Sequence, residues 1–223
     1  MTDSTAEPLD GPRVAPKSGG AAKQLVIFLH GVGSDGNDLI QLAPMLAEVL
    51  PDAAFVSPHA PYPFDMAPMG RQWFSLRDDR PAAIDQQVAD TYGHVDRFLD
   101  AEMARAGVAA AQVALVGFSQ GGMMALQTAL RRIEPLAAVA AMSTILPHAY
   151  TLQNEIASRP PVLLVHGDQD NVLPVHGCNE SERALKAHNV PVMAHILRGR
   201  GHEIDQEGFG LLRDFLVGRL KPA

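Results

Sequence analysis

The feature that most constrains the fold of this chain is an apolar run that ends in a Gly-x-Ser-x-Gly turn and leads directly into a helix-forming segment. The run covers residues 113–116, the turn covers residues 117–121, and the expected helix reaches about Arg132. A strand that turns sharply into a helix leaves no room for bulk two residues before and after its tip, and Gly117 and Gly121 occupy these positions. The pattern therefore predicts that Ser119 projects its hydroxyl from a strained turn between a buried strand and a helix.

Strand-like and helix-like segments alternate along the rest of the chain. Short, continuously apolar runs such as Leu25–Leu29 are typical of strands that are buried on both faces. Strands are predicted at 25–29, 53–56, 113–116, 136–142, 161–166 and 192–197, and helices at 39–50, 84–106, 120–132, 174–188 and 205–219. This order predicts an α/β fold in which a mostly parallel central sheet is flanked by helices on both faces.

The length of 223 residues favours a single domain. We expect residues 21–223 to form one α/β domain and residues 1–20, which are rich in Pro, Gly, Ser and Thr, to form a flexible N-terminal tail. The tail lacks the apolar stretch of a secretory signal, and no run in the chain is long enough for a membrane-spanning helix. Cys178 is the only cysteine, so no intrachain disulfide can form and a reducing cytoplasm is the expected location.

The charge of the chain restricts its expected partners. The formal net charge is −7, from 18 basic and 25 acidic residues that are spread along the sequence. An acidic balance without a basic block argues against nucleic acid or an anionic membrane surface as the main partner. We therefore expect no nucleic-acid binding and no stable membrane insertion, whereas a homodimer is compatible with these properties.

A long Pro-rich loop, Pro58–Pro81, follows the predicted strand at 53–56 and carries Trp73, the only tryptophan. Loops of this length inside a compact domain are usually functional or disordered. The loop is rich in Pro, Met and aromatic residues rather than in charge alone, which favours a functional role.

A serine hydroxyl needs a base to become a good nucleophile, and the base needs an acid that orients it. Asp168 and Asp170 both follow the predicted strand at 161–166, and either of them could simply cap a turn. Asp170 is the better candidate for the acid, because the turn at Gly167-Asp168 can carry the next carboxylate toward the edge of the sheet. Asp168 is then expected to be structural.

His202 is the candidate base among the nine histidines. It lies in a Gly-rich loop between the last predicted strand and the last predicted helix, from which an imidazole can reach Ser119. The histidines at 94, 176, 188 and 195 lie in or near predicted elements and have no evident catalytic pairing.

Two backbone N–H groups are expected to stabilise a developing oxyanion. Gln120 directly follows Ser119 at a helix N-terminus, and Val32 lies in the Gly-rich turn after the predicted strand at 25–29. Only their amides matter in this interpretation, so the side chains of both residues are expected to be nearly incidental. The Gly-rich stretch 31–36 could instead suggest a phosphate cradle, but neither G-x-G-x-x-G nor a P-loop lysine is present.

These motifs together resemble the α/β-hydrolase family of carboxylesterases, lysophospholipases and acyl-protein thioesterases. The resemblance runs from about Leu25 to Leu220 and rests on segments 29–38, 58–61, 73–74, 117–122, 166–170 and 201–202. It implies a small enzyme without a large lid domain, cofactor or metal, and a small-molecule ester or thioester as its substrate. It also implies a catalytic triad of Ser119, Asp170 and His202, with the amides of Val32 and Gln120 as the oxyanion hole.

The expected acyl pocket lies beside this site, where ligands gather in open α/β sheets. Its predicted lining is Trp73, Leu76, Ile145, Leu146, Val172 and Leu173. The chain departs from the family at Ser75, where family members commonly carry an aspartate, and in the highly charged segment 76–80 that follows.

The leading hypothesis is a serine carboxylesterase that acts through an acyl-enzyme. A lysophospholipase, an acyl-protein thioesterase and an acyltransferase that uses the same triad are alternatives. A non-catalytic binding module on the same fold is disfavoured, because such a protein has no need for a complete triad and both glycines of the serine turn.

Overall fold

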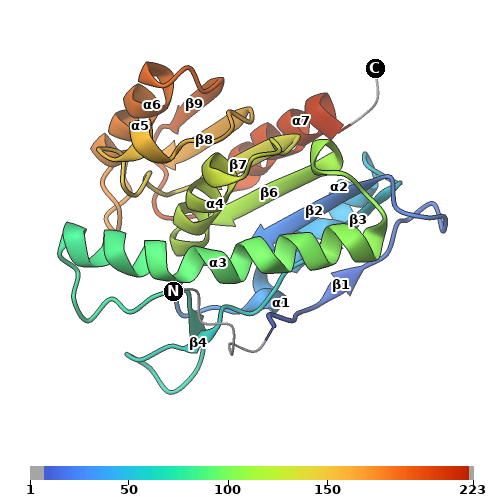
Figure 1. Ribbon diagram of the computed structural model, residues 1–223, viewed down its shortest axis with the longest axis horizontal. Helices are drawn as coiled ribbons and strands as arrows, with labels where there is room; N and C mark the ends of the chain where they lie inside the picture. Colours follow the sequence, from blue (N-terminus) through green and yellow to red (C-terminus); the bar gives the residue numbers. More distant parts are fainter. Residues whose placement is uncertain (1–7, 221–223) are drawn as a thin grey trace.

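The computed structural model describes residues 8–220 and contains one large and one small sheet (Figure 1). In the large sheet the strands follow the order β1-β3-β2-β6-β7-β8-β9, and the small sheet pairs β4 with β5. The strands are β1 (Arg13–Val14), β2 (Gln24–Leu29), β3 (Ala53–Val56), β4 (Tyr62–Pro63), β5 (Arg71–Gln72), β6 (Val113–Phe118), β7 (Ala138–Met142), β8 (Val162–Gly167) and β9 (Val192–Leu197). The strands from β3 to β9 in this order pair in parallel, and only β1 is antiparallel to its neighbour.

Helices cover both faces of the large sheet. One face packs against α3 (Pro81–Ala106), α4 (Gln120–Arg131), α5 (Leu152–Glu155) and α6 (His176–Ala187). The other face packs against α1 (Gly36–Leu39), α2 (Ala43–Ala47) and α7 (Gln206–Leu220). Two 3₁₀ turns, η1 (Ile40–Leu42) and η2 (Ala110–Gln112), complete the described elements. None of the helices between residues 8 and 220 combines the length and apolar character that a membrane span requires.

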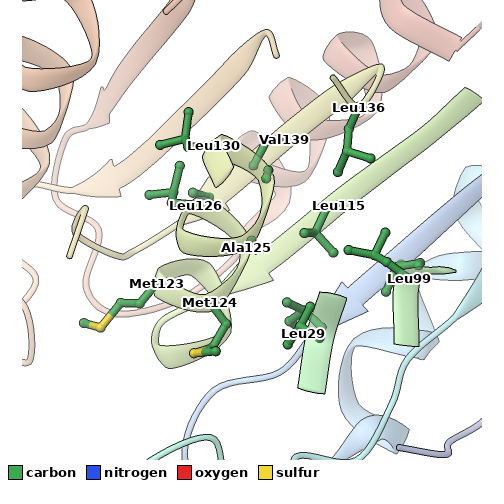
Figure 2. Packing of buried hydrophobic residues seen from close by; sticks show 14 of the residues in the cluster. Leu29, Leu99, Leu115, Met123, Met124, Ala125, Leu126, Leu130, Leu136 and Val139 are labelled. Carbon is green, nitrogen blue, oxygen red and sulfur yellow. The ribbon is translucent and has the colours of Figure 1, made fainter. Parts of the chain in front are cut away.

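The strands are continuously apolar because alternate residues enter two different cores. In β2, Ile27 and Leu29 point into the core beneath α3 and α4, whereas Val26 and Phe28 point into the core beneath α2 and α7. Figure 2 shows the first of these cores, where side chains of α4 lie beside residues from β2, β6 and α3. Burial on both faces explains why the strands lack the polar alternation of a half-exposed sheet.

The predicted fold class is confirmed, and most predicted elements lie within a few residues of the observed ones. The predicted strands at 53–56 and 192–197 have the same bounds as β3 and β9. The predicted helix at 39–50 is instead divided into α1, η1 and α2. Pro44 lies in the first turn of α2, and it has no N–H to continue the hydrogen bonds of a preceding helix.

Part of segment 1–20, which was expected to form a flexible tail, pairs with the large sheet in the structure. Residues 1–7 lie outside the described residues, but β1 pairs with the edge of β3, with Arg13 opposite Val56. The Arg13 guanidinium also donates to both carboxylate oxygens of Glu102 on α3, over 2.7 and 3.1 Å. Because Glu102 is buried, this ion pair and the strand pairing hold the segment that contains β1 against the domain.

The loop from Pro58 to Pro81 contains the β4-β5 hairpin and packs on the turn that follows β2. The amide of Gly33 donates to the carbonyl of Arg71, and the amide of Arg71 donates to the carbonyl of Ser34, both over 2.8 Å. The loop therefore supports the residues at the carboxyl end of β2 through backbone hydrogen bonds.

The turn between β6 and α4 has the strained geometry that the sequence predicts. Ser119 has φ 54° and ψ −121°, a conformation that L-residues rarely adopt. A Cβ on Gly117 would lie 2.2 Å from the carbonyl oxygen of Gly121, and one on Gly121 would lie 2.0 Å from that of Leu29. Both glycines are required because backbone from two other segments occupies the space of a side chain.

The crowding at Gly121 predicts opposite effects for the same substitution at two helical glycines. Gly121→Ala should lower the free energy of unfolding by more than about 2 kcal/mol, because the added methyl meets backbone that cannot move away. Gly210→Ala in α7, where a Cβ would meet nothing within 4 Å, should raise it by about 0.4–1 kcal/mol through helix propensity. Urea denaturation of both variants tests this prediction, and wild-type stability of Gly121→Ala would contradict it.

Candidate active site

The predicted site residues lie together at one edge of the large sheet. Ser119 follows β6, Asp170 follows β8 and His202 follows β9, while Val32 follows β2. These four strands are parallel, so their carboxyl ends meet at the same edge. Residues that are distant in the sequence are thereby brought into one cluster.

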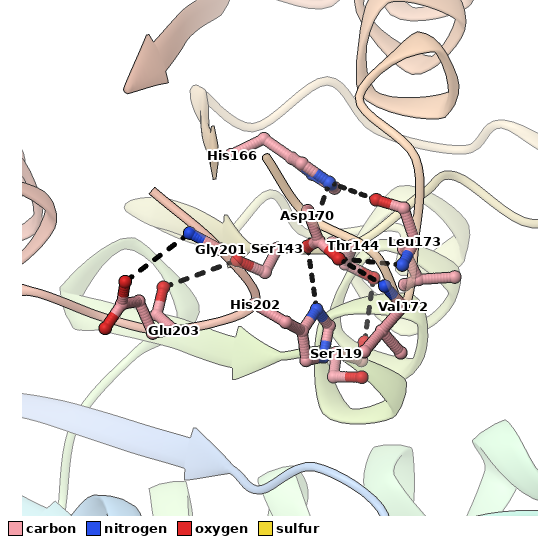
Figure 3. Close-up of polar contacts among 10 residues, drawn as sticks. All are labelled: Ser119, Ser143, Thr144, His166, Asp170, Val172, Leu173, Gly201, His202 and Glu203. Atoms are coloured by element: carbon pink, nitrogen blue, oxygen red, sulfur yellow. Dashed lines mark hydrogen bonds and ion pairs between the residues drawn. The ribbon is translucent and has the colours of Figure 1, made fainter. Parts of the chain in front are cut away.

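The carboxylate of Asp170 orients the ring of His202 (Figure 3). Oδ2 of Asp170 lies 2.7 Å from Nδ1 of His202, and Oδ1 accepts hydrogen bonds from the amides of Val172 and Leu173 over 2.9 and 2.8 Å. Burial alone would raise the pKa of the Asp170 carboxyl, but the hydrogen bonds from His202, Leu173 and Val172 outweigh it and hold the pKa below its ordinary value. The carboxylate therefore stays ionised and fixes which ring nitrogen of His202 faces away from it.

The Ser119 side chain lies next to the ring of His202 (Figure 3). Because Nδ1 of His202 is engaged by Asp170, Nε2 is the nitrogen that can accept a proton. The ring of Phe118 packs against the imidazole with 4.8 Å between centroids. The turn itself is held by Thr144, whose hydroxyl donates to the carbonyl of Ser119 over 2.7 Å.

Asp168, the second carboxylate that the sequence offered, makes a different contact. Its Oδ1 accepts a 2.6 Å hydrogen bond from the amide of Gly199, and its own amide donates to the carbonyl of Leu197. Asp168 thus joins the turn after β8 to the loop after β9, and Asp170 is the carboxylate that contacts His202.

The amides of Val32 and Gln120 have the surroundings expected of free donors. Among residues 8–220, neither N–H has a hydrogen-bond acceptor within the protein. The two segments are close to the serine, since a Cβ on Gly31 would lie 3.4 Å from Cβ of Ser119. Two unused donors beside a serine hydroxyl can stabilise negative charge on a bound carbonyl oxygen.

His30 fixes the direction in which the Val32 amide points. The amide of Ala60 donates to Nε2 of His30 over 3.0 Å, so the proton of the neutral ring is on Nδ1, which lies 2.7 Å from the carbonyl oxygen of Gly31. Burial lowers the pKa of His30 and keeps this ring neutral. The carbonyl of Gly31 and the N–H of Val32 belong to one planar trans peptide and point in opposite directions, so holding one fixes the other.

The expectation that the Gln120 side chain is incidental is wrong. Oε1 of Gln120 accepts from the amide of Trp73 over 3.0 Å, and Nε2 donates to the carbonyl of Phe74 over 2.9 Å. These two bonds attach the N-terminus of α4 to the loop that contains β5. A side-chain amide can bond a backbone N–H and C=O at once, but its partners follow only from the fold.

Sequence reasoning also missed His166, which contacts the same carboxylate as His202. Its Nε2 lies 2.7 Å from the carbonyl oxygen of Leu173 and 3.2 Å from Oδ2 of Asp170, and both side chains are fully buried. A carbonyl oxygen only accepts, so the proton of His166 is on Nε2. The signals in the sequence were its position at the end of the predicted strand at 161–166 and its place in segment 166–170, but neither indicated a role for its side chain.

The structure corrects the predicted acyl pocket at Trp73. This residue has no exposed surface, and its indole N–H donates to the carbonyl of His30 over 2.8 Å. It therefore packs inside the protein and has no surface to offer a ligand in this structure. Leu146 is also buried in the core, whereas Leu76, Ile145 and Leu173 are partly exposed and Val172 is exposed.

The chain is similar to known esterases over most of its length. The sequence profile of the phospholipase/carboxylesterase family matches residues 10–218. Esterase YpfH of Escherichia coli (strain K12) is 30% identical over 200 residues, which cover 87% of this chain and 82% of that protein. Acyl-protein thioesterase 1 of Cryptococcus neoformans var. neoformans is 31% identical over 172 residues, which cover 72% and 71% of the two chains.

The crystal structure of esterase PE8 is similar to this chain with a TM-score of 0.92 and 42% sequence identity, and the match covers 96% of this chain and 100% of that one. The fold and the clustered side chains define an α/β-hydrolase, a serine hydrolase that acts on ester bonds. The chain belongs to the phospholipase/carboxylesterase family.

The lowered pKa of Asp170 predicts how its contribution to stability depends on pH. A carboxyl whose pKa is lower in the folded than in the unfolded chain stabilises the fold at pH values above its pKa in the unfolded chain, 3.8. It loses this effect as the pH falls through its pKa in the folded chain. The difference in unfolding free energy between wild type and Asp170→Asn should be constant above about pH 5 and shrink below about pH 4. Urea titrations at several pH values measure it, with Asp79→Asn as an exposed control. A constant difference down to about pH 3 would contradict the prediction.

Proposed function

We propose that this protein is a carboxylesterase that forms an acyl-enzyme on Ser119, with His202 as the base and Asp170 as the acid that orients it. The observation that carries this proposal is the 2.7 Å contact between Asp170 and Nδ1 of His202, with Ser119 beside the same ring on a strained turn. Such an arrangement activates a hydroxyl that is otherwise a weak nucleophile.

In the mechanism we propose, each step of ester hydrolysis uses one or more of these groups. Oγ of Ser119 attacks the ester carbonyl while Nε2 of His202 takes the hydroxyl proton, and the amides of Val32 and Gln120 stabilise the negative oxygen of the tetrahedral intermediate. When this intermediate collapses, the bond to the alcohol breaks and the His202 proton passes to the leaving oxygen. A water molecule, deprotonated by the same histidine, then attacks the acyl-enzyme and releases the acid and the free serine.

The substrate we propose is a carboxylic ester or thioester with an apolar acyl group. Leu76, Ile145 and Leu173, which are partly exposed, and Val172, which is exposed, follow β5, β7 and β8. We propose that these apolar residues form a rim beside the reacting groups. The amides of Val172 and Leu173 donate to Asp170, so these two residues lie next to the site. The names of the relatives, esterase and acyl-protein thioesterase, support the same two bond types.

Ser119 should be the residue that reacts with a fluorophosphonate probe. Ser119→Ala should abolish labelling and lower kcat for a p-nitrophenyl ester by roughly 10³-fold or more, because no other group can form the acyl-enzyme. Ser143→Ala is the matched control, since Ser143 also has a positive φ of 45° and follows the neighbouring strand β7. Labelling of Ser119→Ala at another residue, or near-normal turnover by it, would refute the assignment of the nucleophile.

Two aspartates on the same turn should contribute very differently to the rate. Asp170→Asn should lower kcat on the order of 10⁴-fold, because an amide at this position favours the tautomer of His202 that cannot take the serine proton. Asp168→Asn should cost far less, since its partner is the amide of Gly199. The two values of kcat are compared at temperatures equally far below each melting point, and the reverse ranking would show that Asp168 is the acid.

A further inference from the structure

Trp73 lies between the two segments that carry the free amides. It is fully buried and uses both of its N–H groups, the backbone one toward Gln120 and the indole one toward His30. One of these partners, Gln120, has an amide without an acceptor among residues 8–220, and the other, His30, lies two residues before Val32. The two N–H groups of this buried residue are thus satisfied by the same two segments that carry the amides of Gln120 and Val32.

The contact between Trp73 and Gln120 holds the N-terminus of α4, which carries the first of the two amides. Oε1 of the Gln120 side chain accepts a hydrogen bond from the amide of Trp73 over 3.0 Å, and Nε2 donates to the carbonyl of Phe74 over 2.9 Å. This two-point attachment restricts both the position and the rotation of Gln120 at the first turn of α4. Its backbone N–H is held in place together with the side chain.

The contact between Trp73 and His30 holds the loop after β2, which carries the second amide, that of Val32. The indole N–H of Trp73 lies 2.8 Å from the carbonyl oxygen of His30, and the two rings pack with 5.5 Å between centroids. The His30 ring in turn holds the carbonyl of Gly31, and with it the peptide whose N–H belongs to Val32. A continuous chain of buried hydrogen bonds therefore runs from Gln120 through Trp73 to the peptide of Val32.

We infer that Trp73 is a positioning residue that sets the distance between the two oxyanion donors, and that the Gln120 side chain is the second part of this device. The inference rests on the proposed function, because it concerns donors to a tetrahedral intermediate. Both amides must lie within hydrogen-bond distance of the same oxygen, so a small change in their spacing weakens stabilisation of the transition state. Binding of the ground-state ester depends much less on this spacing, and the loss falls on kcat.

Two substitutions separate this role from simple packing. Trp73→Phe removes the indole donor but keeps an aromatic ring, and Gln120→Met removes both side-chain hydrogen bonds but keeps the backbone amide. Each should lower kcat for a p-nitrophenyl ester roughly tenfold or more, with KM within about twofold of wild type. The affinity for a trifluoromethyl ketone, which forms a tetrahedral adduct with the serine, should fall by the same factor as kcat/KM.

The double variant provides a further test. If both residues belong to one connection, Trp73→Phe combined with Gln120→Met should lose less activity than the product of the two single losses. Phe55→Leu is the control for stability, because Phe55 is equally buried but packs in the opposite core against Phe28. It should lower the melting temperature without changing the ratio between kcat and ketone affinity.

The outcomes distinguish this inference from the proposed function. If fluorophosphonate does not label Ser119 in the wild-type protein, the proposed function fails. If Ser119 is labelled but Trp73→Phe and Gln120→Met keep wild-type kcat and ketone affinity, only the positioning role is overturned. A loss in Trp73→Phe that grows with acyl-chain length would also overturn it, because that result means that Trp73 lines the acyl pocket.

Discussion

The close contact of Gly121 with the carbonyl oxygens of Leu29 and His30 determines how the rest of the site can be arranged. It lets the N-terminus of α4 lie directly against the end of β2, which no residue with a side chain would allow. The positive φ of Ser119 costs on the order of 1–3 kcal/mol, and the burial of α4, in which every residue but Arg131 is buried, offsets it. Packing of α4 against β2 therefore positions Ser119 and the amides of Val32 and Gln120.

Around this contact, the polar groups of the site are held by partners that are themselves buried. Asp170 binds two amides and lies within hydrogen-bond distance of His202 and His166, and no part of its side chain is exposed. Burial without these partners would protonate the carboxyl, since a charge is costly away from water. His30, in the loop after β2, and Trp73 are likewise held by hydrogen bonds between buried groups. Both halves of the site are therefore held in place by buried hydrogen bonds.

Much of the fold could be predicted because its signals are local. Apolar runs identify strands that are buried on both faces, and Gly107 ends α3 in a left-handed conformation that glycine adopts easily. The segment that contains β1 could not be predicted, because Arg13 pairs with Glu102, far along the chain, and nothing near Arg13 shows this. The β4-β5 hairpin was missed for the same reason, since backbone bonds to the turn after β2 hold it in place.

The sequence by itself determined which residues we propose for the chemistry of the site. A serine between two glycines, a carboxylate after one strand and a histidine after another predict Ser119, Asp170 and His202, because the carboxyl ends of parallel strands meet at one edge. Only the tertiary structure decided what supports these residues. Trp73 looked like a pocket residue and is an internal connector, the Gln120 side chain looked incidental and holds a loop, and His166 had no assigned role. The partners of the Trp73 indole and of the Gln120 side chain are 43 and 47 positions away in the sequence, and hydrogen bonds of side chains to such distant backbone leave no periodic pattern that could reveal them. His166 is only 4 positions from Asp170, but the two side chains meet through the turn after β8, which no periodic pattern in the sequence specifies.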